Sequence, residues 1–549
     1  MKYQNAIYMI LLALLVLCAG CVQSEPAGQL PAGDISPVPE YGGKLIQPML
    51  GEPDNLIPPL SSSSSSTTIT SNIYVAPLKY NKDIELVPWA AESFEVLDGG
   101  KLLRFKLRED IRWFDGMPVT AADVEFTYKM MIDPDTPTAY AGDYLAVKDF
   151  KRTGKYSFEV RYDEVFARAT VTWARAILPK HALEGADLTK TPLSRMPLGA
   201  GPYKLKEWVA GQHLILEANE DFFEGKPYID ELVYRIIPDS GTQFMELKAG
   251  NINAMSLTPQ QYLYQTKGNK WKELYNRFMY PSSSYTYLGY NLKHPLFKNR
   301  NVRVAIAHAI DKDELVRGVL YGLGEETVGP YRPGTWMNNT NIQPYAYSPE
   351  QALEMLAKEG WIDSDKDGVL DKDGKPFEFT ALTNQGNVQR IRTATILQAR
   401  LAAIGIKMKI RTVEWAAFIR EFVNKGRFDA VILGWTITQD PDIFDVWHSS
   451  RAVEGGLNFV HYINPELDEL LLKGRHSLDR AYRKKVYDQV QEVLHRDQPY
   501  CFLYVPMALP IVSAKVQGVK VAPAGIGYNS EKWWIPKFMQ QHENTKVIQ

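Results

Sequence analysis

Aspartate residues alternate along segment 363–371, which reads DSDKDGVLD. Carboxylates at every second position, followed by glycine, are typical of the start of a calcium-binding loop, because Ca²⁺ prefers several oxygen ligands around a tight turn. The twelfth position of such a loop is Gly374, where a bidentate glutamate is usual. A hairpin stabilised by its own aspartates is therefore the alternative, and a bound ion would have a structural role far from any ligand. The candidate calcium ligands are Asp363, Asp365, Asp367, Val369 through its carbonyl, and Asp371.

Sequence signatures of enzymes are missing from the chain. It contains no Gly-x-Ser-x-Gly, no His-Glu-x-x-His and no Gly-x-x-x-x-Gly-Lys pattern, and its nine histidines are scattered. These absences disfavour an enzyme, and we expect that the protein requires no cofactor. A catalytic site assembled in space is the alternative, and turnover of a bound molecule would distinguish it from stoichiometric binding.

The N-terminus has the pattern of an export signal. Lys2 precedes an apolar run over residues 6–17, and the small residues Ala19 and Gly20 precede Cys21. This layout predicts a signal peptide over residues 1–20, since the apolar run is short for a membrane-spanning helix. Residues 17–21 (LCAGC) resemble a bacterial lipobox, although Cys occupies a position where Leu or Val is usual. The resemblance implies lipidation of Cys21; an uncleaved helix and cleavage without lipid are the alternatives.

Composition narrows the class further. The chain has 549 residues, 45% hydrophobic and 23% charged, with a formal net charge of −2. These values indicate two or three folded units, and they argue against a nucleic-acid-binding protein, which would carry a strong basic excess. If Cys21 carries lipid, Cys501 has no internal disulfide partner. Segment 21–41, rich in Pro, Gly, Ser and Gln, is expected to be a flexible linker between membrane and domain.

Apolar periodicity indicates a mixture of helices and strands. Residues 388–404 have the pattern of an amphipathic helix that ends at Gly405, and alternation over residues 406–411 predicts a half-buried strand. Residues 428–435 follow as a buried strand, so this region is an α/β unit. Further predictions are a strand over residues 44–50, a helix that starts in the Ser/Thr run 61–68 (with a linker as the alternative), a helix capped by Asp311 and Glu314, and a helix over residues 482–493.

Several segments resemble, in one order, the peptide/nickel-type family of bacterial extracellular solute-binding proteins, which includes the dipeptide and oligopeptide receptors of ABC importers. Together these segments span roughly residues 45 to 515, and the first is the family's signature region. They are 88–95 (PWAAESFE), 113–124 (WFDGMPVTAADV), 199–203 (GAGPY), 223–230 (FEGKPYID), 434–442 (GWTITQDPD), 447–450 (WHSS) and 498–500 (QPY).

The resemblance implies an α/β fold of the type II periplasmic-binding-protein class, a Venus flytrap. Two lobes would close by a hinge around a ligand, and a third domain would be inserted in lobe 1. The expected boundaries are lobe 1 over 42–72, 191–285 and 506–549 including a C-terminal tail, the inserted domain over 73–190, and lobe 2 over 286–505.

The resemblance also places the ligand at the end of the buried strand and in the loop that follows it. A peptide ammonium needs a carboxylate, because burying it alone would cost several kcal/mol. Many peptide receptors of the family have Asp three residues after the Trp, where this chain has Thr438, so standard N-terminus recognition is in doubt. Asp440 or Asp442 would then take over that role, or would only cap the next helix. The candidate ligand-binding residues are Trp435, Thr438, Asp440, Asp442, Asn458, Tyr504 and Glu52.

The expected function is capture of oligopeptides or dipeptides outside the cytoplasm and delivery to the permease subunits of an ABC importer, with ATPases behind them. The protein would be a monomer, in the periplasm or at the cell surface, held to the membrane by its N-terminal lipid, with no nucleic-acid partner. An oligosaccharide or a nickel complex is the alternative ligand for the same fold. A sensor or chaperone-like binder is the alternative from another class.

Overall fold

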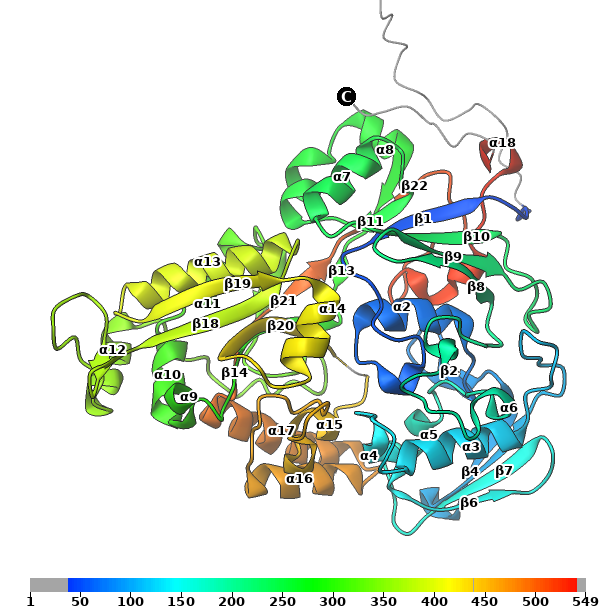
Figure 1. Ribbon diagram of the computed structural model, residues 1–549, viewed down its shortest axis with the longest axis horizontal. Helices are drawn as coiled ribbons and strands as arrows, with labels where there is room; N and C mark the ends of the chain where they lie inside the picture. Colours follow the sequence, from blue (N-terminus) through cyan, green and yellow to red (C-terminus); the bar gives the residue numbers. More distant parts are fainter. Residues whose placement is uncertain (1–37, 438, 541–549) are drawn as a thin grey trace, which may run out of the picture.

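The computed structural model describes residues 38–437 and 439–540 of the chain. The predicted signal peptide, Cys21 and most of the predicted linker lie outside these residues, as does Thr438. Figure 1 shows two bodies side by side, one at the left and one at the right, joined by central strands, with helices α7 (Ser240–Lys248) and α8 (Asn269–Leu274) above the junction.

The right-hand body contains a four-stranded sheet in the order β1-β10-β9-β8, in which β1 runs parallel to β10 and the other pairs are antiparallel. Helix α2 (Ser64–Ile73) lies below this sheet in Figure 1. The strands are β1 (Lys44–Met49), β8 (Tyr203–Val209), β9 (His213–Ala218) and β10 (Glu231–Ile236).

Residues between β1 and β8 form a second sheet, in the order β4-β5-β7-β6, at the lower right of Figure 1. Asp115 and Gly116 form a tight turn in this region, and Gly116 has the positive φ of 87° that favours glycine. The elements are β2 (Leu78–Tyr80), β3 (Leu86–Pro88), β4 (Ala91–Leu97), β5 (Leu102–Leu107), α3 (Ala121–Ile132), α4 (Ala141–Tyr144), β6 (Val147–Arg152), β7 (Ser157–Tyr162), α5 (Ala169–Thr172) and α6 (Lys180–Leu183).

The left-hand body is built on a mixed sheet in the order β13-β21-β14-β20-β18-β19, with β15 paired to β21. Strands β18, β19 and β20 are parallel, and the pairs made by β14 and β21 are antiparallel. The strands are β13 (Tyr280–Pro281), β14 (Ser284–Tyr290), β15 (Gly324–Glu326), β18 (Glu378–Asn384), β19 (Lys407–Val413), β20 (Ala430–Thr436) and β21 (Tyr500–Ala508).

Apolar cores cover both faces of this mixed sheet. Helix α13 packs on one face, and the helices below the sheet in Figure 1 pack toward the other. The helices of the body are α9 (Pro295–Lys298), α10 (Arg300–His308), α11 (Lys312–Gly318), α12 (Pro349–Lys358), α13 (Val388–Ala402), α14 (Trp415–Ala417), α15 (Phe444–Trp447), α16 (Pro465–Arg475) and α17 (Arg480–Asp497).

The chain passes between the two bodies twice in adjacent connections. Strand β12 (Tyr275–Arg277) pairs with β22 (Pro510–Ser513), which also pairs with β11 (Ala254–Ser256). Strand β13 follows β12 along the chain, and β21 precedes β22. These two strands, β13 and β21, pair in the mixed sheet. Two short connections side by side are the arrangement a hinge requires, because a few residues there can absorb a rotation of whole bodies. The domain boundaries named above stay a prediction.

Elements with local signals are confirmed. The Ser/Thr run begins helix α2, Gly405 follows α13 with φ of 75°, and Asp311 caps α11 by accepting a hydrogen bond from the backbone of Glu314. Strands β1, β19 and β20 and helix α17 lie where the pattern predicts them.

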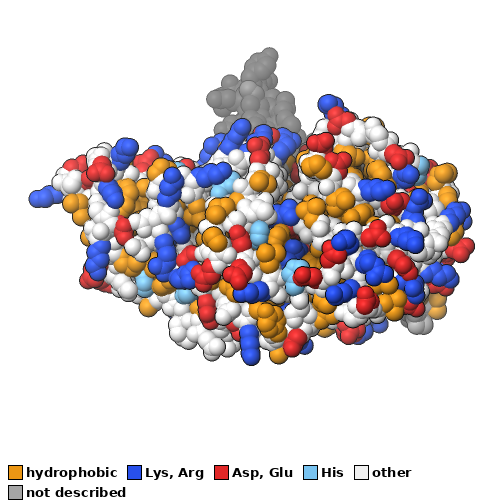
Figure 2. All heavy atoms as spheres, turned by 90° about the horizontal axis from the view of Figure 1, so that it is seen from below, with side chains coloured by type: hydrophobic (Ala, Val, Ile, Leu, Met, Phe, Trp, Pro, Cys, Tyr) orange, Lys and Arg blue, Asp and Glu red, His pale blue; other side chains and the backbone are white. Residues whose placement is uncertain are grey.

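Among the described residues, no helix is long and apolar enough to cross a membrane. The face in Figure 2 carries Lys and Arg mixed with Asp and Glu, without a large area of one sign.

Candidate ligand-binding cleft

A cleft in two compartments lies between the two bodies. The first has a volume of about 640 Å³ and the second of about 620 Å³. Both are lined by Ser64 and Thr68 of α2, and by Arg390 of α13 and Trp415 of α14. Because these residues come from opposite bodies, a ligand held there contacts both, and its binding stabilises the closed arrangement.

The first compartment has an aromatic wall at the end of β20. Trp435 lines it, stacks on Phe459 with ring centroids 5.8 Å apart, and donates from Nε1 to the hydroxyl of Tyr500 at 3.2 Å. The indole is therefore fixed in one orientation and presents a flat apolar surface to the cavity. Tyr285, opposite Trp435 on β14, lines the same compartment. Such rings bind side chains or sugars by contact area and stacking.

Asp440 and Asp442 are both held by arginines of the same body. Asp440 accepts two hydrogen bonds from Arg483 of α17, at 2.6 and 2.9 Å. Asp442 lines the first compartment, accepts from Nε of Arg475 at 2.6 Å, and accepts from the backbone of Phe444 at 2.9 Å. This last bond holds the first backbone N–H of α15, whose N-cap is Ile443 and has no side-chain capping bond of its own.

Asp442 belongs to a buried ring of four charges that joins the two bodies. Arg168 donates to Asp143 at 2.8 Å, Arg475 donates to Asp442 at 2.6 Å, and Arg475 also bonds Asp143 across the boundary. These side chains are between 1% and 9% exposed. Burial raises the pKa of Asp143, but Arg168 and Arg475 more than offset this and leave the pKa below its usual value. Each body contributes one acid and one base, so the ring is neutral as a whole and within each body.

The remaining predicted ligand contacts lie away from the two compartments. The Asn458 side chain is fully buried and bonds the carbonyls of Trp447, His448 and Tyr462. The Tyr504 hydroxyl is 2.8 Å from that of Thr393, inside the core of the left-hand body.

Glu52 accepts from the indole of Trp208 at 2.6 Å, in the right-hand body. Thus, of the predicted set, the structure brings Trp435 and Asp442 to the cavity, while Asn458, Tyr504 and Glu52 satisfy groups within the protein.

Arg390 is a functional candidate that sequence reasoning missed. It is the only charged side chain among the described residues that line the second compartment. Its Nη1 donates to Asn384 at 2.8 Å, no described carboxylate pairs with it, and burial lowers its pKa. A buried cation without a counter-charge favours a ligand that supplies one. Its position after the carboxyl end of β18 was the available signal, because ligands of α/β sheets bind at that edge.

Polar groups without charge complete the second compartment. They can bond the backbone of an extended peptide, and the hydroxyl of Ser240 is buried without a hydrogen-bond partner. Polar members of the lining are Gln47, Ser64, Ser65, Thr68, Ser240, Gln243, Ser256, Thr258, Asn384, Asn387 and Gln389. Among the described residues that line either compartment, none is a histidine.

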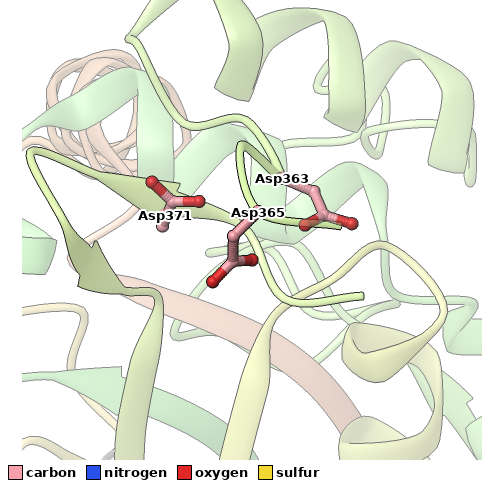
Figure 3. Close-up of side chains that lie close together, drawn as sticks. All are labelled: Asp363, Asp365 and Asp371. Carbon is pink, nitrogen blue, oxygen red and sulfur yellow. The ribbon is translucent and has the colours of Figure 1, made fainter. Parts of the chain in front are cut away.

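The aspartate-rich segment forms a tight loop, and Figure 3 shows the side chains of Asp363, Asp365 and Asp371 around it. Asp363, Asp365 and Asp371 each offer a carboxylate oxygen, and these atoms lie within 4.8 Å of one another. Asp371 also accepts from the backbone and hydroxyl of Ser364, and Asp367 accepts from the backbone of Val369. The backbone around the turn is therefore organised by aspartate side chains whether or not an ion binds.

The fold and the interlobe cleft define an extracellular solute-binding protein of the type II periplasmic-binding class. Residues 85–454 match the family of bacterial extracellular solute-binding proteins, family 5 Middle, and the chain belongs to this family. It is 36% identical over 544 residues to the oligopeptide-binding protein AppA of Bacillus subtilis, covering 97% of this chain and 98% of that protein.

Solved structures agree with this assignment. The AppA structure, in complex with a nonapeptide, superimposes with a TM-score of 0.86 at 36% identity, covering 91% of this chain and all of that chain (100%). DppA from Helicobacter pylori in complex with the peptide STSA gives a TM-score of 0.80 at 26% identity, covering 91% and 99%. NikZ from Campylobacter jejuni in complex with Ni(L-His) gives a TM-score of 0.80 at 25% identity, and the match covers 89% of this chain and 99% of that chain.

Proposed function

We propose that this protein captures oligopeptides or dipeptides in the two-compartment cleft and delivers them to the permease of an ABC importer. The observation that carries the proposal is the character of the cleft. It combines an aromatic wall at Trp435, many uncharged hydrogen-bonding groups, and a buried cation, Arg390, that has no carboxylate partner among the described residues. A peptide supplies a complement to each: apolar side chains, a backbone that needs hydrogen bonds, and a terminal carboxylate.

The peptide complexes of AppA and DppA support this choice of ligand. The nickel–histidine complex of NikZ makes a metal complex the second candidate. The cleft favours the peptide, because its described lining offers hydroxyls and amides and no imidazole that would bind nickel.

The experiment is a thermal-melt screen of residues 22–549 after unfolding and refolding to remove copurified ligand. Peptides of two to nine residues, manno- and cello-oligosaccharides, and nickel with histidine are added separately. A ligand at 100 times its dissociation constant stabilises the folded state by about 2.7 kcal/mol, so the true ligand raises the melting temperature. We expect shifts with peptides. A shift only with sugars or only with nickel–histidine would remove the peptide assignment and keep the solute-binding class.

We also propose that the mature chain begins at Cys21 and is anchored to the membrane through lipid on that residue. The support is the order of charge, apolar run and small residues before Cys21. Full-length protein expressed with labelled palmitate should carry the label and sediment with membranes, and Cys21→Ala should lose both properties. Equal labelling of the variant would contradict the anchor without affecting ligand capture.

A calcium ion in loop 363–371 is a further proposal, with a structural role. It rests on the three converging carboxylates and on the tight turn at Gly368, whose φ is 88°. The remaining ligands would be the carbonyl of Val369 and Asp367, as expected from the spacing.

A further inference from the structure

Three carboxylates line the first compartment, and one of them is not satisfied by the protein. Asp143 and Asp442 belong to the four-charge ring. Asp445 of α15 differs: its Oδ1 is buried and accepts no hydrogen bond, and no described residue donates one to its other oxygen. Its side chain keeps 15% exposure, which belongs to atoms other than the buried Oδ1. Oδ1 itself packs against Gly142 of α4, so the acceptor capacity left for a ligand in the compartment is that of the other oxygen, and unused capacity on a partly buried carboxylate calls for a donor.

The nearest cation does not supply that donor. Nε of Arg451, in the 3-10 turn Ser449–Arg451, lies 3.6 Å from Oδ1 and has no hydrogen-bond partner itself. Arg175, which lines the same compartment, lies over the ring of Tyr140 at 4.3 Å. His448, at the end of α15, adds no compensating charge, because burial lowers its pKa and favours the neutral ring.

The balance of surrounding charges disfavours the ionised form of Asp445. Burial and then Asp143 raise its pKa to about 6, although Arg475, Arg451 and Arg175 act in the opposite direction. A cationic donor placed in the compartment would reverse this balance, because hydrogen bonds to the charged form lower the pKa of a carboxyl group.

We propose that Asp445 is the acidic contact for the cationic group of the ligand, the α-ammonium of a free peptide N-terminus, and that capture requires Asp445 in its deprotonated form. This inference rests on the proposed peptide-binding function. Its chemical logic is that Asp440 and Asp442 are occupied by Arg483 and Arg475, so they cannot serve the ligand without breaking buried ion pairs. Asp445 alone among the carboxylates of this compartment gains a partner when a ligand enters.

The test is calorimetric titration with penta-alanine, free or N-acetylated, at pH 7.0 and pH 5.0. Because the pKa of Asp445 is about 6 without ligand and capture requires the deprotonated form, the wild type binds the free peptide about 10-fold more weakly at pH 5.0 than at pH 7.0. The sign follows because protons compete with the ligand for the same carboxylate. N-acetylation should weaken binding at pH 7.0 by a factor of about 10 or more, since a charge-assisted hydrogen bond is lost.

Asp445→Asn should bind weakly at both pH values, with neither the pH dependence nor the preference for a free N-terminus. Glu469→Gln removes one negative charge from the exposed side of α16 and serves as the matched control, which should behave as the wild type. If Asp445→Asn retains both effects, or if the wild type binds peptides without either effect, the inference is overturned and the peptide-binding function stands. If the wild type binds no peptide at all, the proposed function fails, and the inference fails with it.

Discussion

At the scale of single residues, the cleft separates side chains that serve the fold from those left for a ligand. Trp435 serves both, because its indole N–H is used by Tyr500 while one ring face borders the cavity. Arg390 is the opposite case: burial lowers its pKa, and among the described residues it donates to the neutral amide of Asn384 and to no carboxylate. A group whose charge is disfavoured in the empty cleft and useful with a ligand present is a candidate for recognition.

Replacing Trp435 should therefore affect both stability and binding. We expect Trp435→Ala to cost about 2 kcal/mol of unfolding free energy, because the indole is only half-buried, and to weaken peptide binding roughly 10-fold. Trp435→Phe keeps the aromatic wall and loses only the bond to Tyr500, so it should retain most of the affinity. Denaturant unfolding and calorimetric titration measure the two effects. Normal binding by the alanine variant would remove Trp435 from the site.

Replacing Arg390 should separate binding from stability. Arg390→Met removes a poorly compensated buried cation at the loss of one hydrogen bond, so the unfolding free energy should change by less than about 1 kcal/mol. Binding of a peptide with a free carboxyl terminus should fall about 10-fold, and the amidated peptide should bind wild type and variant alike. Arg400→Gln, at the far end of α13 and paired with Glu314, is the control that should leave binding unchanged. An equal loss of affinity for the free and the amidated peptide would mean that Arg390 does not bind the terminal carboxylate.

At the scale of elements, neighbouring residues in the sequence were sufficient to predict helix ends and strands. The contacts between distant segments could be found only from the folded structure. The cap at Asp311, the glycine after α13 and the strand β20 follow from neighbouring residues, so the pattern was sufficient for them. The partners of Asp440 and Asp442 come from α17 and α16, more than thirty positions away, and nothing in those helices marks Arg483 or Arg475 as different from surface arginines.

Placement of the site by resemblance met the same limit. The resemblance predicts a ligand at the segment that ends β20, and Trp435 lines the first compartment there, while its contact with a ligand stays a prediction. Asn458 was a reasonable candidate by position, yet its amide holds the backbone around Tyr462 and faces no cavity. Asp445 carries no signal in the sequence, because its lack of a partner depends on the orientation of Arg451 and on the approach of α4 from the other body.

The aspartate loop allows a prediction that concerns one element alone. If segment 363–371 binds calcium, saturating Ca²⁺ should raise the unfolding free energy by about 2.7 kcal/mol at 100 times the dissociation constant, and a chelator should reverse this. Asp365→Asn should abolish the calcium effect and leave peptide binding intact, since the loop lies at the outer edge of the body. Identical melting curves with calcium and with chelator would identify the loop as a hairpin held by its own side chains.

At the scale of the whole molecule, the buried ring of charges is suited to an interface that must open and close. Opening separates Asp143 with Arg168 from Asp442 with Arg475, so each body keeps a bonded acid–base pair and no buried charge is left alone. The contact between the bodies is extended by the backbone N–H of Ala167, which donates to the carbonyl of Arg475 at 2.7 Å. Closure thus gains two ion pairs between the bodies, Arg475 with Asp143 and Arg168 with Asp442 at 3.9 Å, and each charge that it buries keeps a partner within its own body.

Removing one charge of the ring should weaken the binding of every ligand by the same factor. Asp143→Asn removes the charge that joins Arg475 to the opposite body, so the closed state loses stability relative to the open one. Because the apparent affinity scales with the closed population, dissociation constants for different peptides should all rise by one common factor, about 10-fold for a loss of about 1.4 kcal/mol. Small-angle scattering of the unliganded variant should show a larger radius of gyration than the wild type.

Glu164→Gln, which removes only the exposed contact with His476 at 3.1 Å, is the matched control and should change neither the dissociation constants nor the radius of gyration. A variant that weakened some peptides and spared others would show that Asp143 contacts the ligand directly, and the ring would then be part of the recognition surface that closure completes.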